Sequence, residues 1–344
     1  MKVYVSNYLS RSISILDYST LEFERDIKLD ENIYPHNFCI DNRQQLAYIP
    51  SSLDGELYVL DLSIGKIIDN ISIGGKLTNI ALCNDELFIS NEDSNSIYIL
   101  DVKTSNPIGV IGVDNMPHGF DIDSINNRLY VACINSIICI DTISKSICKK
   151  IDTDFKSWHV KLDRNKKEIY TSTLDGKVVV IDEESLKIIK IIDEFLLPVQ
   201  ICFNYEAKKI YVADMGYKKV MILDYDTGEV LDYINIDGDP QGIQISNDYK
   251  LLFISDTKNN LIKDIFNKKK IVFTGDMSKS RAEMRATAIR YGAESPTSIS
   301  GKTNILVIGE EAGNSKLEKA KQLGIEIINE EEFWNIINKE TAME

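Results

Sequence analysis

The stretch LYVACINSIICID (129–141) contains the pattern that decides the fold. A strand-like run, LYVAC, is followed within a few residues by a second apolar run that ends in Asp141. The first run recurs about every 40 residues along the chain. Its other copies are VYVSN (3–7), AYIPS (47–51), LFISN (87–91), IYTST (169–173), IYVAD (210–214) and LFISD (252–256). The aspartates that end the other copies of the second run are Asp17, Asp61, Asp101, Asp182 and Asp224.

Each complete unit carries four short apolar stretches separated by turn residues. One unit reads LAYIP, ELYVLD, IIDNISI and then TNIALC. Alternating polarity, many β-branched residues and turns such as DYDTG (224–228) are typical of strands. Four strands repeated at this spacing are typical of a propeller blade. We therefore predict an all-β propeller over residues 1–264.

The number of blades is less sharply defined. Residues 1–30 supply three strands, five complete blades follow to about residue 236, and residues 241–264 supply two strands and a poor third. This favours about seven blade positions, two of them incomplete. Six are possible if the strand at 241–246 pairs with the strand at 3–7. Either ending leaves a sheet edge that must be covered.

The charge is distributed unevenly between the repeats and the rest of the chain. The net charge is −14, and residues 268–344 contain 12 Lys/Arg against 12 Asp/Glu. The repeats therefore carry the whole negative charge. Because an acidic surface repels phosphate groups, any contact with nucleic acid is expected to come from the C-terminal segment.

Several classes of protein are not favoured by the sequence. No uncharged apolar run reaches about 18 residues, and KVYVS at the start lacks the features of a signal peptide. The six cysteines form no CxxC pair, which indicates buried thiols in a reduced cytoplasm. No GxSxG, HExxH, Walker or calcium-loop motif occurs. We expect a cytoplasmic protein that is not an enzyme, without a cofactor, metal site or membrane segment.

One column of the repeat could form a binding site at a mouth of the central channel. It lies twelve residues before the aromatic residue of the strand run, or ten at Thr78 where the loop is shorter, at the start of the predicted innermost strands. Its members are His36, Thr78, His118, Trp158, Val199 and Gln241. The alternative is structural: prolines precede four of these residues, and their role would be to set the turn into the innermost strand. A lyase of the streptogramin type would need a paired His and Glu, and the column contains no Glu.

The aspartates that end the second runs have a simpler interpretation. An aspartate at the end of a strand commonly accepts backbone N–H groups of the turn that follows. We therefore predict a structural role for all of them.

The C-terminal segment follows a different pattern. The sequence predicts strands at 269–277, 303–309 and 325–329, alternating with helices at 280–293, 314–324 and 330–338. Asn314 or Ser315 is expected to cap the second helix and Gly324 to end it. Met284, Ala288 and Ile289 fall on one face of the first helix, which Gly292 should end. This alternation implies a small parallel sheet flanked by helices over residues 265–344.

Two resemblances accompany these patterns. The repeat resembles the YVTN type of β-propeller repeat, whose members serve many functions. The C-terminal segment resembles a BRCT domain, of the type found in NAD-dependent bacterial DNA ligases and the large subunit of replication factor C. The motifs are KTNILVIGE (302–310), AGNSKLEKAKQLG (312–324) and EEEF (330–333).

The BRCT resemblance implies a phosphate site. The family's Thr-Gly pair and basic helix residue match Thr274, Gly275 and Lys316, and members that bind DNA ends add an arginine that matches Arg281. The chemistry is sensible, since a hydroxyl, a free N–H and a helix N-terminus all favour an anion. The structural alternative is that Thr274 and Gly275 only form a turn and Lys316 is a solvated residue.

Together these observations predict a non-enzymatic adaptor. Its BRCT-like domain would bind a DNA 5′-phosphate end or nick, or a phosphoprotein, and its propeller an unknown protein. The main alternative is a small-ligand-binding or enzymatic propeller that uses the mouth near His36 and His118. A third possibility is a chance join of unrelated segments, with a protease-sensitive junction near residues 260–270.

Overall fold

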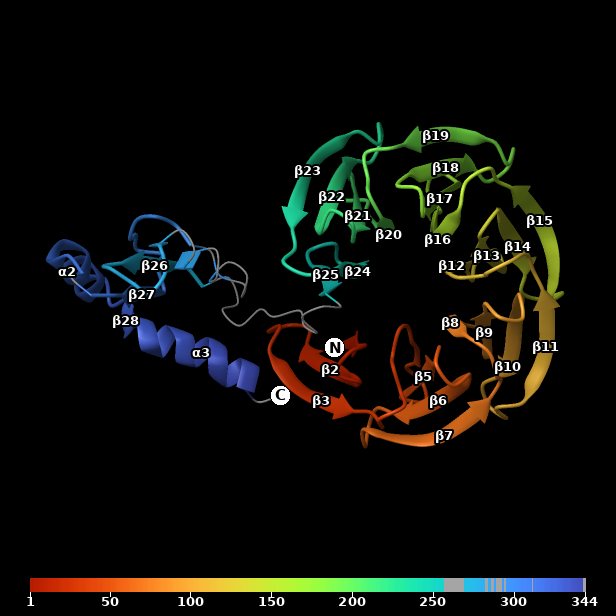
Figure 1. The fold of residues 1–344 in the computed structure, drawn as a ribbon, viewed down its shortest axis with the longest axis horizontal. Helices are drawn as coiled ribbons and strands as arrows, with labels where there is room; N and C mark the ends of the chain where they lie inside the picture. The colour runs from red at the N-terminus through yellow and green to blue at the C-terminus, as the bar shows by residue number, and fades with distance from the viewer. Residues whose placement is uncertain are drawn as a thin grey trace. The chain divides into compact units, whose positions relative to one another are not determined.

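The computed structural model describes residues 1–256, 269–281, 284–285, 288, 293, 295–310 and 312–342, with side chains to residue 336. These residues form a ring of antiparallel sheets and a separate unit with a small parallel sheet (Figure 1). The predicted junction at 260–270 lies almost entirely outside the described residues.

The first sheet of the ring has three strands. They are β1 (Lys2–Asn7), β2 (Ser12–Asp17) and β3 (Phe23–Lys28). Two sheets of four strands follow. They contain β4 (Cys39–Asp41), β5 (Leu46–Pro50), β6 (Glu56–Asp61) and β7 (Lys66–Ser72), then β8 (Leu77–Cys83), β9 (Glu86–Asn91), β10 (Ser96–Asp101) and β11 (Pro107–Gly112).

Three further sheets also have four strands. The first contains β12 (Phe120–Asp123), β13 (Arg128–Cys133), β14 (Ser136–Asp141) and β15 (Ser146–Asp152). The second contains β16 (Ser157–Asp163), β17 (Glu168–Thr173), β18 (Val178–Asp182) and β19 (Ile188–Ile192). The third contains β20 (Pro198–Asn204), β21 (Lys209–Asp214), β22 (Lys219–Asp224) and β23 (Val230–Asn235).

The predicted propeller is confirmed. In each four-stranded sheet the strands follow chain order from the centre of the ring to its rim (Figure 1). Six sheets therefore reach blade size, with three or four strands. At the seventh position, the described residues form β24 (Pro240–Ile245) and β25 (Leu252–Asp256). The alternative pairing of 241–246 with 3–7 is not observed, since β24 and β1 belong to separate sheets.

Apolar packing between successive blades holds the ring together. One core joins β9 and β10 to β13 and β14 through residues such as Phe88, Ile99 and Val131. Equivalent cores join the following blades, and Ile243 of β24 packs against Cys202 and neighbouring residues of the preceding blade. The outermost strands are largely exposed, as expected for the rim of a propeller.

The strand-ending aspartates play the structural role predicted for them. Each accepts one or more backbone N–H groups from the following turn, as Asp141 does from Ser144 at 2.9 Å and Asp224 from Thr227 at 2.7 Å. Equivalent bonds occur at Asp17, Asp61, Asp101 and Asp182.

A bulge interrupts the innermost strand of several blades. In β8 the pairing shifts between Leu77 and Ile80, so that two consecutive residues face Ser90 on β9. The same shift occurs in β16, β20 and β24. A bulge changes the direction of the side chains beside it. It therefore determines which residues of the innermost strands face the channel.

The C-terminal unit has the predicted parallel sheet. Its strands are β26 (Ile271–Thr274), β27 (Ile305–Ile308) and β28 (Glu326–Asn329), with β27 in the centre. The helices whose bounds the described residues define are α2 (Asn314–Gln322) and α3 (Glu330–Ala342). Ala320 of α2 packs on one face of the sheet, and Phe333 of α3 packs on the other.

The helix ends agree only in part with expectation. Gly313 is the N-cap of α2 and no side chain caps it, so the predicted caps Asn314 and Ser315 were wrong. Gly324, with φ of 66°, follows the helix end as predicted. Met284 and Ala288 are buried in the core that contains Phe333, whereas Ile289 and Gly292 lie outside the described residues.

Four of the six cysteines are buried, but Cys148 is exposed and Cys39 half-buried. The expectation of uniformly buried thiols was therefore wrong at these two positions. In the described part of the chain, no helix is long and apolar enough to cross a membrane.

Candidate functional site

The four residues expected to bind phosphate line one hollow of the C-terminal unit. Thr274 is the last residue of β26, Gly275 follows it, and Lys316 lies in the first turn of α2. The hollow has a volume of about 450 Å³. Its lining residues are Thr274, Gly275, Asp276, Arg281, Gly313, Ser315 and Lys316. The fold thus brings together residues from three separate stretches of the chain.

This hollow presents hydrogen-bond donors that have no partner in the described residues. Thr274 is buried, and no described residue bonds its hydroxyl. The backbone N–H of Gly275 likewise has no acceptor among the described residues. The N-terminus of α2 lacks a side-chain cap. Such groups are suited to an oxyanion, which accepts several hydrogen bonds at once.

Charge in the hollow also favours an anion. Arg281 and Lys316 are cationic, Asp276 is the acidic lining residue, and the first turn of α2 contains no acidic residue. The helix dipole adds partial positive charge at the same end. These charges favour an anion over a cation in the hollow.

Gly275 is required by the backbone of this turn. Its φ is 88°, and a Cβ atom there would lie 2.6 Å from the carbonyl oxygen of Glu310. Only glycine satisfies both conditions without movement.

The predicted channel mouth contains a buried cluster around His118. The imidazole of His118 stacks on Trp158, with 3.7 Å between ring centroids, and lies 6.0 Å from the ring of His36. Its Nδ1 atom lies 2.5 Å from Oε1 of Glu92, and the side chains of both residues are buried.

Glu92 is a residue that the repeat column did not reveal. It follows β9, outside the predicted column, and also forms an ion pair with Lys76. Burial raises the pKa of Glu92, but the hydrogen bonds from His118 and Lys76 outweigh it and leave the pKa below its ordinary value. The column itself contains no Glu, as the sequence showed, but Glu92 supplies a buried partner for His118 from outside it.

The other residues of the predicted column are more scattered. His36 is exposed, whereas Thr78 is buried and bonds Ser90, with 2.9 Å between the two hydroxyl oxygens. Val199 is buried, and Gln241 contacts the sulfur of Met215. The column therefore contributes three residues to the cluster: His36, His118 and Trp158.

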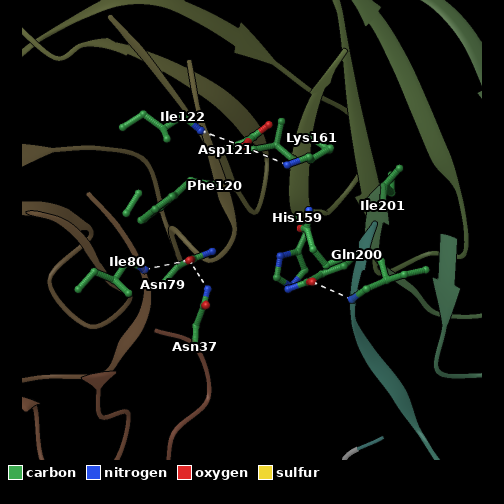
Figure 2. A pocket seen from close by; sticks show the side chains of 14 residues that line it. Asn37, Asn79, Ile80, Phe120, Asp121, Ile122, His159, Lys161, Gln200 and Ile201 are labelled. Carbon is green, nitrogen blue, oxygen red and sulfur yellow. Dashed lines mark hydrogen bonds and ion pairs between the residues drawn. The ribbon is translucent and has the colours of Figure 1, made fainter. Parts of the chain in front are cut away.

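A polar cavity of about 300 Å³ lies among the innermost strands (Figure 2). Its polar lining includes Asn37, Asn79, His159 and Gln200, each one residue after a member of the predicted column. His159 also connects the cavity to the cluster, because its ring lies 5.0 Å from that of His118. Burial and the two nearby histidines hold the pKa of His159 well below its ordinary value, so its ring is neutral near pH 7.

Comparison with known proteins agrees with the two-part architecture. The family model of the BRCA1 C Terminus (BRCT) domain matches residues 262–337. The chain thus combines an N-terminal β-propeller with a C-terminal BRCT domain.

The BRCT region is similar to DNA ligases. The chain is 43% identical to a DNA ligase of Campylobacter hominis over 94 residues, which is 27% of this chain and 14% of the ligase. It is 44% identical to a DNA ligase of Rickettsia bellii over 94 residues, again 27% of this chain and 14% of the ligase. Because the chain spans only about a seventh of these relatives, the similarity does not extend to the ligases as whole proteins.

Solved structures support the fold of the larger part. A chain of Kuenenia stuttgartiensis hydrazine synthase has a TM-score of 0.58 at 20% identity, over 66% of this chain and 75% of that one. A chain of a mitotic checkpoint complex has a TM-score of 0.65 at 14% identity, over 75% of this chain and 81% of that one. At these identities the likeness concerns the fold alone.

Proposed function

We propose that this protein is a non-enzymatic adaptor. Its BRCT domain binds a phosphate group, preferably the 5′-phosphate of a DNA end or nick, and its acidic propeller binds a second protein. The observation that carries this proposal is the hollow that gathers Thr274, Gly275, Arg281 and Lys316.

DNA is favoured over a phosphopeptide for two reasons. The relatives of the BRCT region are DNA ligases. In addition, Arg281 lines the hollow, and the BRCT resemblance matches it to an arginine of members that bind DNA ends. The excess negative charge lies on the repeats rather than on residues 268–344, so the BRCT domain is the part suited to meet a phosphate backbone.

The DNA part is tested by fluorescence anisotropy with the full chain. The probe is a labelled nicked duplex with a 5′-phosphate at the nick, measured at low and moderate salt. We expect binding that weakens as salt rises, because cationic side chains replace counterions at the phosphates. Equal affinity for the intact duplex would contradict recognition of an end or nick.

Arg281→Ala separates the two ligand classes. If DNA is the ligand, this variant loses affinity for the nicked duplex. If a phosphopeptide is the ligand, the variant keeps its affinity for a phosphothreonine peptide, and the wild-type chain prefers that peptide to DNA. The second result would replace the DNA assignment.

The adaptor part concerns the propeller. A protein bound by the propeller is expected to stay with a Lys316→Ala chain, because this substitution alters only the BRCT hollow. The measurement is co-purification with wild-type and variant chains, followed by crosslinking and mass spectrometry. Crosslinks confined to the BRCT domain would contradict a role for the propeller.

A further inference from the structure

The channel cavity has a lining that the adaptor role does not use. Its polar residues lie on the innermost strands of successive blades, and Figure 2 shows Asn79 and Gln200 on opposite sides with His159 between them. Because the cavity lies in the propeller, the inference below does not depend on the proposed function of the BRCT domain.

Backbone hydrogen bonds fix the orientation of the three amide side chains. Asn79 Oδ1 accepts from the N–H of Ile80 at 2.8 Å and also from Asn37 Nδ2. Asn37 Oδ1 accepts from the N–H of Phe38 at 2.8 Å, and Gln200 Oε1 from the N–H of Ile243 at 3.2 Å. A backbone N–H donates to an acceptor, so the oxygen of each amide, rather than its NH₂ group, must face the backbone N–H.

With their oxygens held by the backbone, these amide side chains keep N–H groups that can donate to a ligand in the cavity. Among the described residues, no acceptor is found for Nδ2 of Asn79 or Nε2 of Gln200, and Nδ2 of Asn37 keeps one N–H beyond its bond to Asn79. The amide oxygens of all three residues are already engaged. The amides thus offer N–H groups to a ligand.

The charged residues of the lining add to this donor character. Nζ of Lys161 lies 3.2 Å from Oδ1 of Asp121 and retains further N–H donors. Both carboxylate oxygens of Asp121 are occupied, since Oδ1 also accepts from the N–H of Ile122 and Oδ2 from that of Leu162. Asp121 thus uses three of its roughly four acceptor positions within the protein, whereas Lys161 retains N–H groups for a ligand.

Apolar side chains also line the cavity, beside the further polar residue Gln244. Ile80, Phe120, Val160 and Ile201 belong to the lining, which provides a surface for carbon atoms. A hydrated inorganic ion gains nothing from such a wall, whereas the carbon skeleton of an organic molecule does.

We propose that the channel cavity binds a small organic carboxylate, with the amide N–H groups of Asn37, Asn79 and Gln200 and the ammonium of Lys161 directed at its oxygens. An amine ligand would find the oxygens of these three amides already engaged and would face the Lys161 ammonium. An uncharged polyol would leave several buried donors without strong acceptors, whereas a carboxylate accepts from all of them.

The test uses the full chain and succinate, with succinamide as the uncharged analogue and sodium chloride at matched ionic strength. We expect succinate to raise the melting temperature in a concentration-dependent manner, because a ligand that binds the native state stabilises it. Succinamide and sodium chloride are expected to have no comparable effect. A shift with phosphate but not with succinate would overturn the organic carboxylate.

Two variants locate the site. Gln200→Glu and Asn79→Asp keep the oxygen that the backbone needs but replace the donor with a negative charge. Each is expected to weaken succinate binding by about tenfold or more in calorimetry. The control is Asn235→Asp, which makes the same change on the exposed outermost strand β23 and should bind as the wild type does. Unchanged binding in both cavity variants would place the ligand elsewhere.

A measurement on the wild-type chain covers the case in which the variants fail to fold. The side-chain NH₂ resonances of Asn79 and Gln200 are followed by NMR during a succinate titration. Both are expected to shift with the same saturation curve. Shifts confined to other amides would refute the proposal.

Discussion

Thr274 at the end of β26 and Lys316 in the first turn of α2 line the same hollow, although they belong to different elements. The parallel pairing of β26 with β27 and the short connection from β27 to α2 bring them together. A hydroxyl, an ammonium group and a helix N-terminus therefore lie around the same hollow. This arrangement is the basis for the predictions about phosphate.

Lys316→Ala should weaken binding of a 5′-phosphorylated nicked duplex by roughly tenfold or more, since a charge-assisted contact contributes about 1–3 kcal/mol. The matched control is Lys321→Ala in the last turn of the same helix, outside the hollow. Anisotropy titrations compare the two. A loss of similar size in both variants would show that general charge, rather than the hollow, governs binding.

Gly275→Ala should destabilise the BRCT domain by roughly 1–3 kcal/mol, because alanine is strained at a φ of 88° and its Cβ would meet the carbonyl oxygen of Glu310. Urea unfolding measures the loss. Gly301→Ala is the control, since a Cβ there meets no atom within 4 Å. Equal stability of both variants would contradict the described turn.

The propeller should lose stability in acid. Backbone N–H groups of the following turn, led by Ser144, together with Arg128 hold the pKa of Asp141 at about 2. A carboxyl group with a lowered pKa in the folded state contributes stability above its unfolded value of about 4, and this contribution disappears as the pH falls toward 2. Asp101 and Asp224 have lowered pKa values for the same reason.

Unfolding followed between about pH 5 and pH 2 tests this linkage. Asp141→Asn should reduce the dependence of stability on pH, whereas the same change at the exposed Asp193 should leave it as in the wild type. If the two variants follow the same curve, the turn hydrogen bonds do not set the acid response.

His118 and His36 should differ in their importance for folding. His118→Ala removes a buried partner of Glu92 and a ring stacked on Trp158, so a loss of roughly 2–3 kcal/mol is expected. His36 is exposed, and its replacement by alanine should change stability by less than about 0.5 kcal/mol. Thermal and urea unfolding check both. The reverse order would contradict the cluster at the mouth.

The sequence predicted most of the fold because repeated strands and a change of period are local features. Alternating polarity and strand-ending aspartates located the blades, and each aspartate bonds its own turn. Capping was harder to predict: Gly313 is the N-cap of α2, although Asn314 and Ser315 are better capping residues by type.

The channel was only partly predictable, and the bulges of the innermost strands explain why. The column counted from the aromatic residues contains Thr78 and Trp158, whereas the cavity is lined by Asn79 and His159. A bulge inserts one residue into the strand, so spacing alone does not show which neighbour faces the channel. Glu92 was missed because its pairing with His118 joins neighbouring blades.

The central claim, that Lys316 contacts the phosphate of a DNA end, is tested most directly by a double-mutant cycle. Affinity of the full chain and of Lys316→Ala is measured for the nicked duplex with and without its 5′-phosphate. Each change alone should weaken binding by roughly tenfold or more, and the two losses should not add because both remove the same contact. Fully additive losses, or equal binding of both duplexes by the wild-type chain, would contradict the assignment.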